Sequence, residues 1–581
     1  MLAARDTNGA TDATEVTLNK CLSGVDNATF MFDSAGITCV VSMLIWLEGD
    51  VKSETAVERL ELLCKQQPKF RARCVRGSFF RLGHWVDMSM PPSDEENTGT
   101  GPTPDAPHRK PWNEWHCSDH LETVNMFADA VDDEDECVDA EYERAAVEKL
   151  FSEFVSRPFD SHVPMWRVQM IRGLSGPRTA LGVMMHHCMA DGIGLTIALI
   201  SLLSPNNNTV EAYAQQKNSA PPLLTYSKRS ANASTLPPSA DTPVSNGNTF
   251  TGSLATRLST LTHAAKTHVT VTASILSRML LGLLTLVSVF ARLTFFKPQT
   301  LYPKRSQTVQ RRIAWSEPMD MQDMQTIRAA YPNITLNDVM VACLERAYRA
   351  HLDSLALERA GKDAAAAESA VESEQSGSAA APSAYRDRLG ILIPKSMRHS
   401  GDMRFENVVG IEFLLLDSKP GQQSTKNIIE RTHTRMLKVK RSLFGWTMFV
   451  MQRTLFAYVP GLLFKRLFRY YIGKAQSVLS NVAGSRKALY FGSEDTEQHR
   501  VLSWMLYPPM LTEDHMAFGV YSYNGQVHFT AMGDAPNESP NRIRAFTNNF
   551  TAAYKIMLTD AQEKLATKQQ QDEMPTELLL P

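Results

Sequence analysis

Hydrophobic and polar positions follow one another in blocks that divide the chain into two apolar-rich halves, residues 15–204 and 308–560. Residues 205–307 between them combine a polar linker with one short apolar helix, and residues 561–581 form a polar tail. No internal repeat is visible, and the chain is long enough for a large core. The pattern therefore predicts a globular protein of two main units.

Three polar segments interrupt this pattern, the first of them within the linker. Residues 205–253 are rich in Asn, Ser and Pro; they are too long and too polar to pack, so we expect them to be disordered. Residues 91–110 are rich in Pro, Ser, Asp and Glu, which predicts a surface loop. Residues 356–384 are rich in Ala, Glu and Ser, which predicts a mobile insertion with some helix.

One predicted turn places two histidines between a strand and a helix. Residues 179–185 are apolar and rich in β-formers, which predicts a buried strand. Residues 193–203 are apolar without interruption after Gly194, which predicts the start of a helix. His186 and His187 therefore lie on the connecting turn, where side chains can face a cleft.

The residues of this turn favour proton transfer. An imidazole titrates near neutrality, so His187 can take a proton from a hydroxyl group without a metal. Asp191 can cap the following helix and fix the turn. Gly192 can adopt backbone angles closed to other residues, or leave room for a substrate. A metal triad of His186, His187 and Asp191 is disfavoured, because adjacent residues of a strand point to opposite faces. We therefore expect no metal site.

Two other regions are apolar enough to contact a membrane. Residues 279–291 form a continuous apolar run of 13 residues, whereas a spanning helix needs about 20. The run predicts an embedded or interfacial helix in preference to a true span. Residues 443–474 interleave bulky apolar side chains with basic ones, which is typical of a helix at an anionic membrane surface. A pair of core helices whose charged residues face water is the alternative.

Composition narrows the class of protein. The net charge is −2, from 60 basic and 62 acidic residues, so nothing global indicates nucleic-acid binding. The first 17 residues are polar and lack the core of a signal peptide. No P-loop, GxGxxG or GxSxG motif supports nucleotide hydrolysis or serine-hydrolase chemistry. The eight cysteines show no CxxC pair, which favours scattered reduced thiols over a zinc site: Cys21, Cys39, Cys64, Cys74, Cys117, Cys137, Cys188 and Cys343.

The turn matches HHxxxDG over residues 186–192, and on this motif the chain resembles the acyl-CoA-dependent acyltransferase superfamily. Further blocks resemble one branch of it, the wax ester synthase/diacylglycerol acyltransferase family, in the order of that family. Their residues are 68–71 (PKFR), 164–168 (PMWRV), 335–339 (TLNDV), 394–398 (PKSMR), 407–410 (NVVG), 480–484 (SNVAG) and 523–525 (YNG). The resemblance covers roughly residues 15 to 560, interrupted by insertions. Each block by itself is weak evidence for the family, but the occurrence of all seven in the order of that family is specific to it.

The resemblance implies an α/β fold, an α+β sandwich, made of two halves that each resemble a chloramphenicol acetyltransferase subunit. Each half should be a mixed sheet flanked by helices. A tunnel is expected between them, open at both ends, with His187 near its middle.

The resemblance also implies roles for particular residues. His187 is the expected general base, His186 a packing or hydrogen-bonding residue, and Asp191 part of a structural salt bridge. For Asp338 a second role stays open. Thr335 precedes it at capping-box spacing, so capping of the helix alone would explain this aspartate. The residues expected to line or support the substrate channel are Gly192, Pro164, Trp166, Asn337, Asp338, Asn407, Gly410, Ser480, Asn481 and Gly484.

The implied activity is the transfer of a long-chain acyl group from acyl-CoA to a fatty alcohol or to diacylglycerol, giving wax esters, triacylglycerol or both. Acyl-CoA is then a co-substrate, and neither a cofactor nor a nucleic-acid partner is expected. Because such acceptors reside in membranes, the expected location is the cytosolic face of the endoplasmic reticulum or a lipid droplet. Two alternatives stay open: a condensation-type enzyme with a carrier-tethered acyl donor, and a catalytically silent lipid-binding relative.

Overall fold

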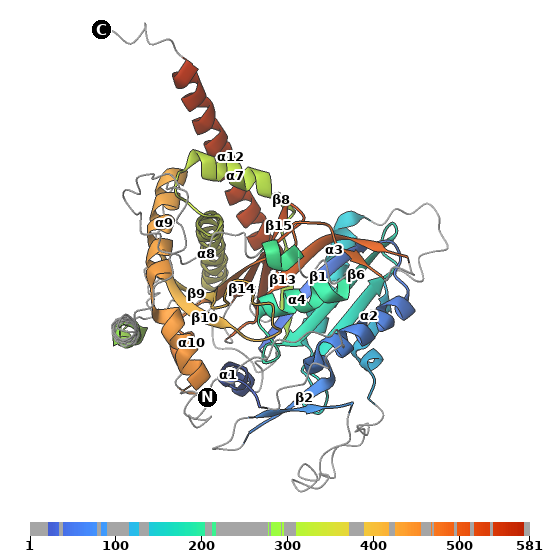
Figure 1. Ribbon diagram of the computed structural model, residues 1–581. Coiled ribbons are helices and arrows are strands. Elements are labelled where there is room, and N and C mark those ends of the chain that lie inside the picture. Colours follow the sequence, from blue (N-terminus) through green and yellow to red (C-terminus); the bar gives the residue numbers. More distant parts are fainter. Residues whose placement is uncertain are drawn as a thin grey trace, which may run out of the picture.

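The described residues fold into two large mixed β-sheets, each flanked by helices, and one small two-stranded sheet (Figure 1). The computed structural model describes residues 21–33, 39–77, 83–89, 115–126, 139–203, 212–216, 277, 280–291, 293–295, 310–370, 388–417, 424–454, 466, 470–492, 497–511, 516–534 and 539–573. The α/β class and the organisation in two halves, both expected from the sequence, are confirmed. The predicted loop at residues 91–110 lies outside the described residues.

The first sheet has six strands in the order β12-β13-β1-β6-β5-β4. They are β1 (Val40–Glu48), β4 (Leu121–Asn125), β5 (Trp166–Arg172), β6 (Arg178–His186), β12 (Tyr490–Phe491) and β13 (His499–Tyr507). The central strands β1 and β6 are buried along nearly their whole length, which explains why both are continuous apolar runs. Around this sheet lie α2 (Ser53–Gln66), α3 (Ala140–Ser156) and α4 (Gly192–Leu203). The predicted strand and helix on either side of the histidine turn are therefore confirmed as β6 and α4.

The first half also contains smaller elements. Helix α1 (Gly24–Phe32) precedes β1, and strands β2 (Ala72–Val75) and β3 (His84–Asp87) pair as a separate two-stranded sheet. Two single 3₁₀ turns directly precede strands: η1 (Pro68–Arg71) precedes β2, and η3 (Cys117–His120) precedes β4.

The second sheet has the strand order β10-β9-β11-β14-β15-β7, with β8 paired to β15. Its strands are β7 (Arg311–Trp315), β8 (Met319–Asp320), β9 (Arg388–Ser396), β10 (Val409–Asp417), β11 (Ser477–Ala483), β14 (Met516–Tyr523) and β15 (Gln526–Asp534). The helices of this half are α7 (Met321–Ala330), α8 (Leu336–Ala370), α9 (Thr425–Arg441), α10 (Phe444–Thr454) and α12 (Pro540–Glu573). Helix α12 closes the core, where Phe550 stacks on Phe529 of β15 with 3.7 Å between ring centroids.

The second half of the sequence contributes two strands to the first sheet. Strands β12 and β13 lie late in the sequence, yet β13 pairs antiparallel with β1 of the first sheet, with Ser42 opposite Tyr507. Where the sheets cross, the hydroxyl of Thr530 in β15 donates to the main-chain oxygen of Leu506 at 2.5 Å. The predicted division at residues 308–560 therefore differs from the structure, since part of that segment completes the first half.

The segment between the halves is not wholly unstructured. Residues 212–216 form a helical turn on which Tyr213 is buried, and its hydroxyl donates to the main-chain oxygen of Ala483 at 2.7 Å. Gln216 donates to the main-chain oxygen of Gly484 at 2.8 Å. The expectation of disorder across residues 205–253 is wrong for this turn, because an aromatic side chain within the polar stretch anchors it to the core. The predicted polar tail also begins as helix, since α12 continues to Glu573.

The apolar run in the middle of the chain forms a helix over residues 280–291. Leu286 on one of its faces is buried against Phe444 and Met448 of α10. Other faces are apolar yet exposed, through Leu280, Leu281, Leu283, Leu284 and Val287, each more than half exposed. Among the described residues, no helix combines the length and hydropathy needed to cross a bilayer.

Candidate active site

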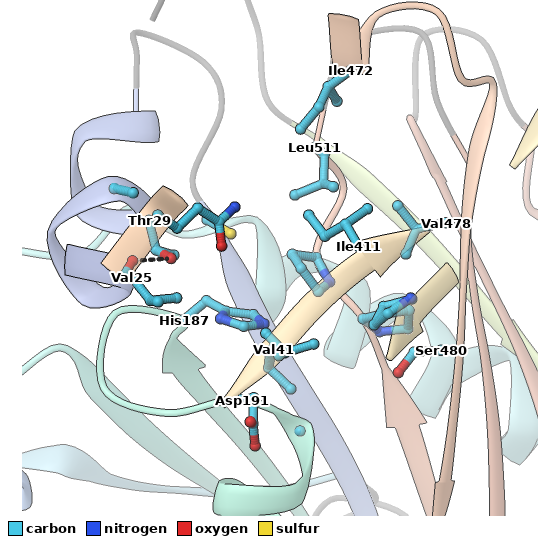
Figure 2. A pocket seen from close by; sticks show the side chains of 18 of the residues that line it. Val25, Thr29, Val41, His187, Asp191, Ile411, Ile472, Val478, Ser480 and Leu511 are labelled. Atoms are coloured by element: carbon cyan, nitrogen blue, oxygen red, sulfur yellow. Dashed lines mark hydrogen bonds between the residues drawn. The ribbon is translucent and has the colours of Figure 1, made fainter. Parts of the chain in front are cut away.

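A cavity lies between the two halves, around the histidine turn. Its volume is about 870 Å³ including the part open to solvent. The first half contributes α1, β1 and the turn after β6, and the second contributes β9, β10, α10 and β11. Figure 2 shows His187 and Val41 from the first half together with Ile411 and Val478 from the second. Most of the lining is apolar.

His187 is held in this cavity by its main chain. Its amide donates to the carbonyl of Cys39 at 2.7 Å, and its carbonyl accepts from the side chain of Asn407 at 2.6 Å. Nδ1 of the ring is buried and has no hydrogen-bond partner, and the residue lines the cavity. Burial lowers the pKa of His187 below its usual value, and the Asp191 carboxylate offsets part of that shift. The imidazole is therefore neutral at physiological pH and able to accept a proton.

His186 is directed into the core of the first half. Its Nδ1 accepts from the main-chain amide of Cys188 at 3.1 Å, so the ring proton lies on Nε2, which is 2.9 Å from Oδ2 of Asp33. Phe30 packs against the same ring edge-on. Because the side chain is fully buried and both nitrogens have partners, His186 fixes the turn and does not reach the cavity.

Asp191 joins the two halves. Its Oδ1 caps α4 by accepting from the amide of Gly194 at 2.7 Å, and it also forms a salt bridge with Arg398 at 3.0 Å. Oδ2 accepts from the amide of Val408 at 2.9 Å. Arg398 and Val408 belong to the second half, so one buried carboxylate ties both halves to the turn that carries His187.

Asn407 makes a second connection between the halves. Its amide nitrogen donates to His187 as described above and also to Oδ1 of Asp26 in α1, at 2.9 Å. Lys69 lies 3.3 Å from Oδ2 of the same aspartate and donates to the main-chain oxygen of Met189 at 2.9 Å. The contacts of Asn407 and Lys69 with the main chain of the turn hold it in position.

Three glycines predicted at the site allow close approaches of different kinds. Gly192 does not have a positive φ, so the first explanation considered for it is wrong; instead it lines the cavity, where its missing side chain leaves space. A Cβ at Gly410 would lie 2.3 Å from the main-chain oxygen of Gly445, and one at Gly484 would lie 2.6 Å from the ring of Tyr521. The latter two glycines serve packing within the protein.

Several predicted channel residues do not line the described cavity. Trp166 is buried in the first half, where its indole donates to the main-chain oxygen of Phe70 at 2.7 Å and stacks on His120. Pro164 lies just before β5, and in the sheet β6 separates β5 from β1, the strand that lines the cavity. The expectation that these two form the cavity wall is therefore wrong.

The second-half pair Asn337 and Asp338 is also set apart from the described cavity. Oδ2 of Asp338 accepts from the amide of Thr335 at 2.7 Å and lies 2.9 Å from Nδ1 of His433, so it caps α8 and ties it to α9. Asn337 accepts a hydrogen bond from Asn481. Ser480, one residue earlier on β11, does line the cavity, because successive residues of a strand face opposite sides.

Sequence reasoning missed several functional positions. Thr29, Cys39 and Gln452 line the cavity, but they lie on α1, just before β1 and on α10, where no motif gave a signal. Arg398 stands at the end of the block at residues 394–398 and was detectable there, though not its partner. Among the described residues, no three His, Cys, Asp or Glu side chains are grouped so as to hold a metal; the absence of a metal site stays a prediction.

Comparison with protein families agrees with this geometry. Residues 142–340 match the wax ester synthase/diacylglycerol acyltransferase catalytic domain, and residues 407–557 match the C-terminal domain of the same family. Together these matches cover more than half of the chain. The chain belongs to the wax ester synthase/diacylglycerol acyltransferase family.

Curated relatives in this family resemble the chain over a short segment. A Mycobacterium tuberculosis H37Rv protein named as the diacylglycerol O-acyltransferase tgs1 is 39% identical over 54 residues. A Mycobacterium bovis protein, also named as a diacylglycerol O-acyltransferase, matches to the same extent. The segment covers 9% of this chain and 12% of each relative.

Solved structures match over nearly the whole chain. The wax ester synthase/diacylglycerol acyltransferase of Marinobacter aquaeolei VT8 has a TM-score of 0.52 at 15% identity, covering 94% of this chain and 100% of that protein. The first condensation domain of the calcium-dependent antibiotic synthetase has a TM-score of 0.50 at 12% identity, covering 94% and 96%. At these identities the likeness concerns the fold.

Proposed function

We propose that this protein is an O-acyltransferase that moves a long-chain acyl group from acyl-CoA to the hydroxyl of a fatty alcohol or a diacylglycerol. One observation carries the proposal: the imidazole of His187 lies in an apolar cavity between the halves, and burial lowers its pKa, so the ring is neutral. Membership of the family supports the same reaction.

The proposed reaction needs one proton acceptor. Nε2 of His187 takes the hydroxyl proton while the acceptor oxygen attacks the thioester carbonyl, which forms a tetrahedral oxyanion. When the carbon–sulfur bond breaks, the imidazolium returns the proton to the CoA thiolate. The apolar lining excludes water, which would otherwise compete as the nucleophile. Both oxygens of Asp191 are engaged in structural contacts, so the carboxylate supports the turn and takes no proton.

A lipid surface is proposed as the source of the acceptor. The helix at residues 280–291 packs on α10 through the buried Leu286 and exposes apolar side chains on its other faces, and α10 also lines the cavity through Gln452. Contact of this helix with a membrane or lipid droplet would place the cavity close to its hydrophobic substrates. A location on the cytosolic face of the endoplasmic reticulum or on a lipid droplet follows as part of this proposal.

The experiment that tests the activity uses the full-length protein with labelled palmitoyl-CoA and either hexadecanol or dioleoylglycerol, followed by separation of neutral lipids. The parent should form wax ester, triacylglycerol or both. His187→Ala should lower the rate by about 10²–10⁴-fold, because it removes the general base, while the thermal melting temperature stays within about 2 °C.

The matched control is His162→Ala, which changes a histidine in the loop before β5 and should leave the rate within about twofold. Activity of His187→Ala within a few-fold of the parent would contradict the assignment of the base. Activity with a carrier-bound acyl donor and none with palmitoyl-CoA would favour the condensation-type alternative, and no transfer from either donor would favour a lipid-binding relative.

A further inference from the structure

Two segments that lie far apart in the sequence form one surface beside the cavity. The helix at residues 280–291 packs so closely on α10 that a Cβ at Gly282 would lie 2.5 Å from the hydroxyl of Thr447. Farther along the same helix, the ring of Phe290 packs on that of Tyr471, with 4.2 Å between ring centroids. The apolar helix, α10 and the chain around Tyr471 therefore make one continuous face, and α10 lies at an edge of the molecule (Figure 1).

The outer side chains of this face are aromatic or basic as well as apolar. On α10, Trp446, Phe449 and Arg453 recur at helical spacing and share one side of the helix. Trp446 and Arg453 are exposed, and the guanidinium of Arg453 lies 5.9 Å from the centre of the Phe449 ring. Tyr470 is also exposed, and Nζ of Lys474 lies 4.7 Å from the centre of its ring. The exposed leucines of the helix add apolar bulk to these aromatic and positively charged groups.

The segments that build this face contain no acidic residues. Residues 279–296 have neither aspartate nor glutamate, and residues 441–474 have six basic residues and no acidic one. Because the net charge of the whole chain is only −2, this excess of positive charge is local. Exposed apolar side chains bordered by tryptophan, tyrosine and basic groups are complementary to a layer of negatively charged phospholipid.

We propose that this face docks on an anionic phospholipid bilayer, with the leucines of the helix among the acyl chains and Arg453 and Lys474 at the head groups. The inference rests on the lipid surface of the proposed function and names the charge of that surface. Docking also orients the cavity, because Gln452 and Ile472 line it, while their chain neighbours Arg453 and Tyr471 belong to the face. An acceptor dissolved in the bilayer then enters the cavity beside α10.

A second copy of this chain is the other occupant that an apolar face suits. In a two-fold symmetric dimer the same patch meets itself. Such a contact brings the basic groups of both copies together, which is unfavourable. The charge of the face therefore favours the anionic bilayer.

The test compares the double variant Arg453→Gln/Lys474→Gln with Lys149→Gln/Lys555→Gln, a matched control that removes two exposed basic residues from α3 and α12. The full-length proteins are mixed with vesicles of phosphatidylcholine alone, or with about 30% phosphatidylserine, at low and at high salt. Co-sedimentation measures the bound fraction. Light scattering gives the oligomeric state, and thermal melting checks the fold.

The parent should bind the anionic vesicles at least tenfold more tightly than the neutral ones at low salt, and salt should reduce this difference by screening the charges. Each basic residue at an anionic surface contributes about fivefold in binding, so the double variant should lose tenfold or more on anionic vesicles. Its binding to neutral vesicles should stay within about twofold, and the control should bind both kinds of vesicle like the parent.

Equal binding of the parent to both kinds of vesicle, no binding to either, or a control as weak as the double variant would each overturn the inference. A dimeric parent that binds no vesicle would show that a second copy covers the face. Acyl transfer is measured separately, on detergent-dispersed acceptor. A parent that selects anionic vesicles but transfers no acyl group contradicts the proposed function and supports the docking face, whereas transfer without selection contradicts the docking face alone.

Discussion

The two adjacent histidines show how position on one turn separates two roles. His186 has partners on both ring nitrogens and is fully buried, whereas His187 lines the cavity. Main-chain contacts with Cys39 and Asn407 hold His187 from both halves. The reactive side chain is therefore oriented by its backbone, and its ring is left for the substrate.

The lowered pKa of His187 predicts the pH dependence of the reaction. Burial disfavours the charged ring, so the folded-state pKa lies below the ordinary value of 6.5. A general base must be neutral, so kcat/KM should decrease as the pH is lowered, with a midpoint below 6.5. Initial rates between pH 4.5 and 8, with return to neutral pH as a check on stability, measure this midpoint. A midpoint above 6.5 would show that His187 is stabilised in its charged form.

At the scale of elements, the start of α4 is where the two halves are joined. Asp191 caps this helix and pairs with Arg398, and both side chains are more than nine-tenths buried. Gly194 in the first turn of α4 allows the approach, since a Cβ there would lie 3.2 Å from the main-chain oxygen of Glu406. The helix terminus thus serves as part of the interface between the halves.

Asp191→Asn should lower the free energy of unfolding by about 3–5 kcal/mol, because the charge of Arg398 is left buried without a counter-charge. Chemical denaturation measures the change. Asp50→Asn, which removes an exposed partner of Arg172, is the control and should cost about 1 kcal/mol or less. A loss below about 1 kcal/mol for Asp191→Asn would mean that the hydrogen bonds alone hold the two halves together.

At the scale of the whole molecule, the cavity and the exposed apolar helix share one neighbour. Helix α10 lines the cavity on one side and packs against the helix at residues 280–291 on another. Single exposed apolar residues are common on protein surfaces, but several on one short helix indicate an interaction site. This arrangement links the proposed lipid surface to the proposed entry of the acceptor.

Replacement of Leu280, Leu281, Leu284 and Val287 by Gln should release the protein from phospholipid vesicles. Transfer of each apolar side chain contributes about 1.5–3 kcal/mol when fully buried, so even partial insertion predicts at least a tenfold loss of binding. Vesicle co-sedimentation measures the bound fraction, and activity on detergent-dispersed acceptor should persist because the cavity is unchanged.

The control replaces exposed apolar residues elsewhere, Tyr142, Leu357 and Ile556, by Gln. These changes should leave vesicle binding within about twofold. If the first variant stays bound as tightly as the parent, the lipid contact lies outside this helix, and residues 443–474 become the next segment to test.

The sequence by itself determined the family, the α/β class and the turn that carries His187, because each depends on local order: HHxxxDG, a buried strand before it and an apolar helix after it. It also pointed to Asn407, Ser480 and Asp191 through short blocks. It could not assign Trp166 to the core, since a tryptophan suits a core and a cavity wall equally well.

Only the tertiary structure decided which residues meet across the two halves. The pairing of Asp191 with Arg398, the return of β13 to the first sheet and the place of Gln452 in the cavity all join segments distant in sequence. Such contacts are set by how sheets and helices pack, and no local pattern of hydrophobic and polar residues encodes the partner. Local chemistry therefore identified the reactive turn, whereas packing between distant elements built the cavity around it.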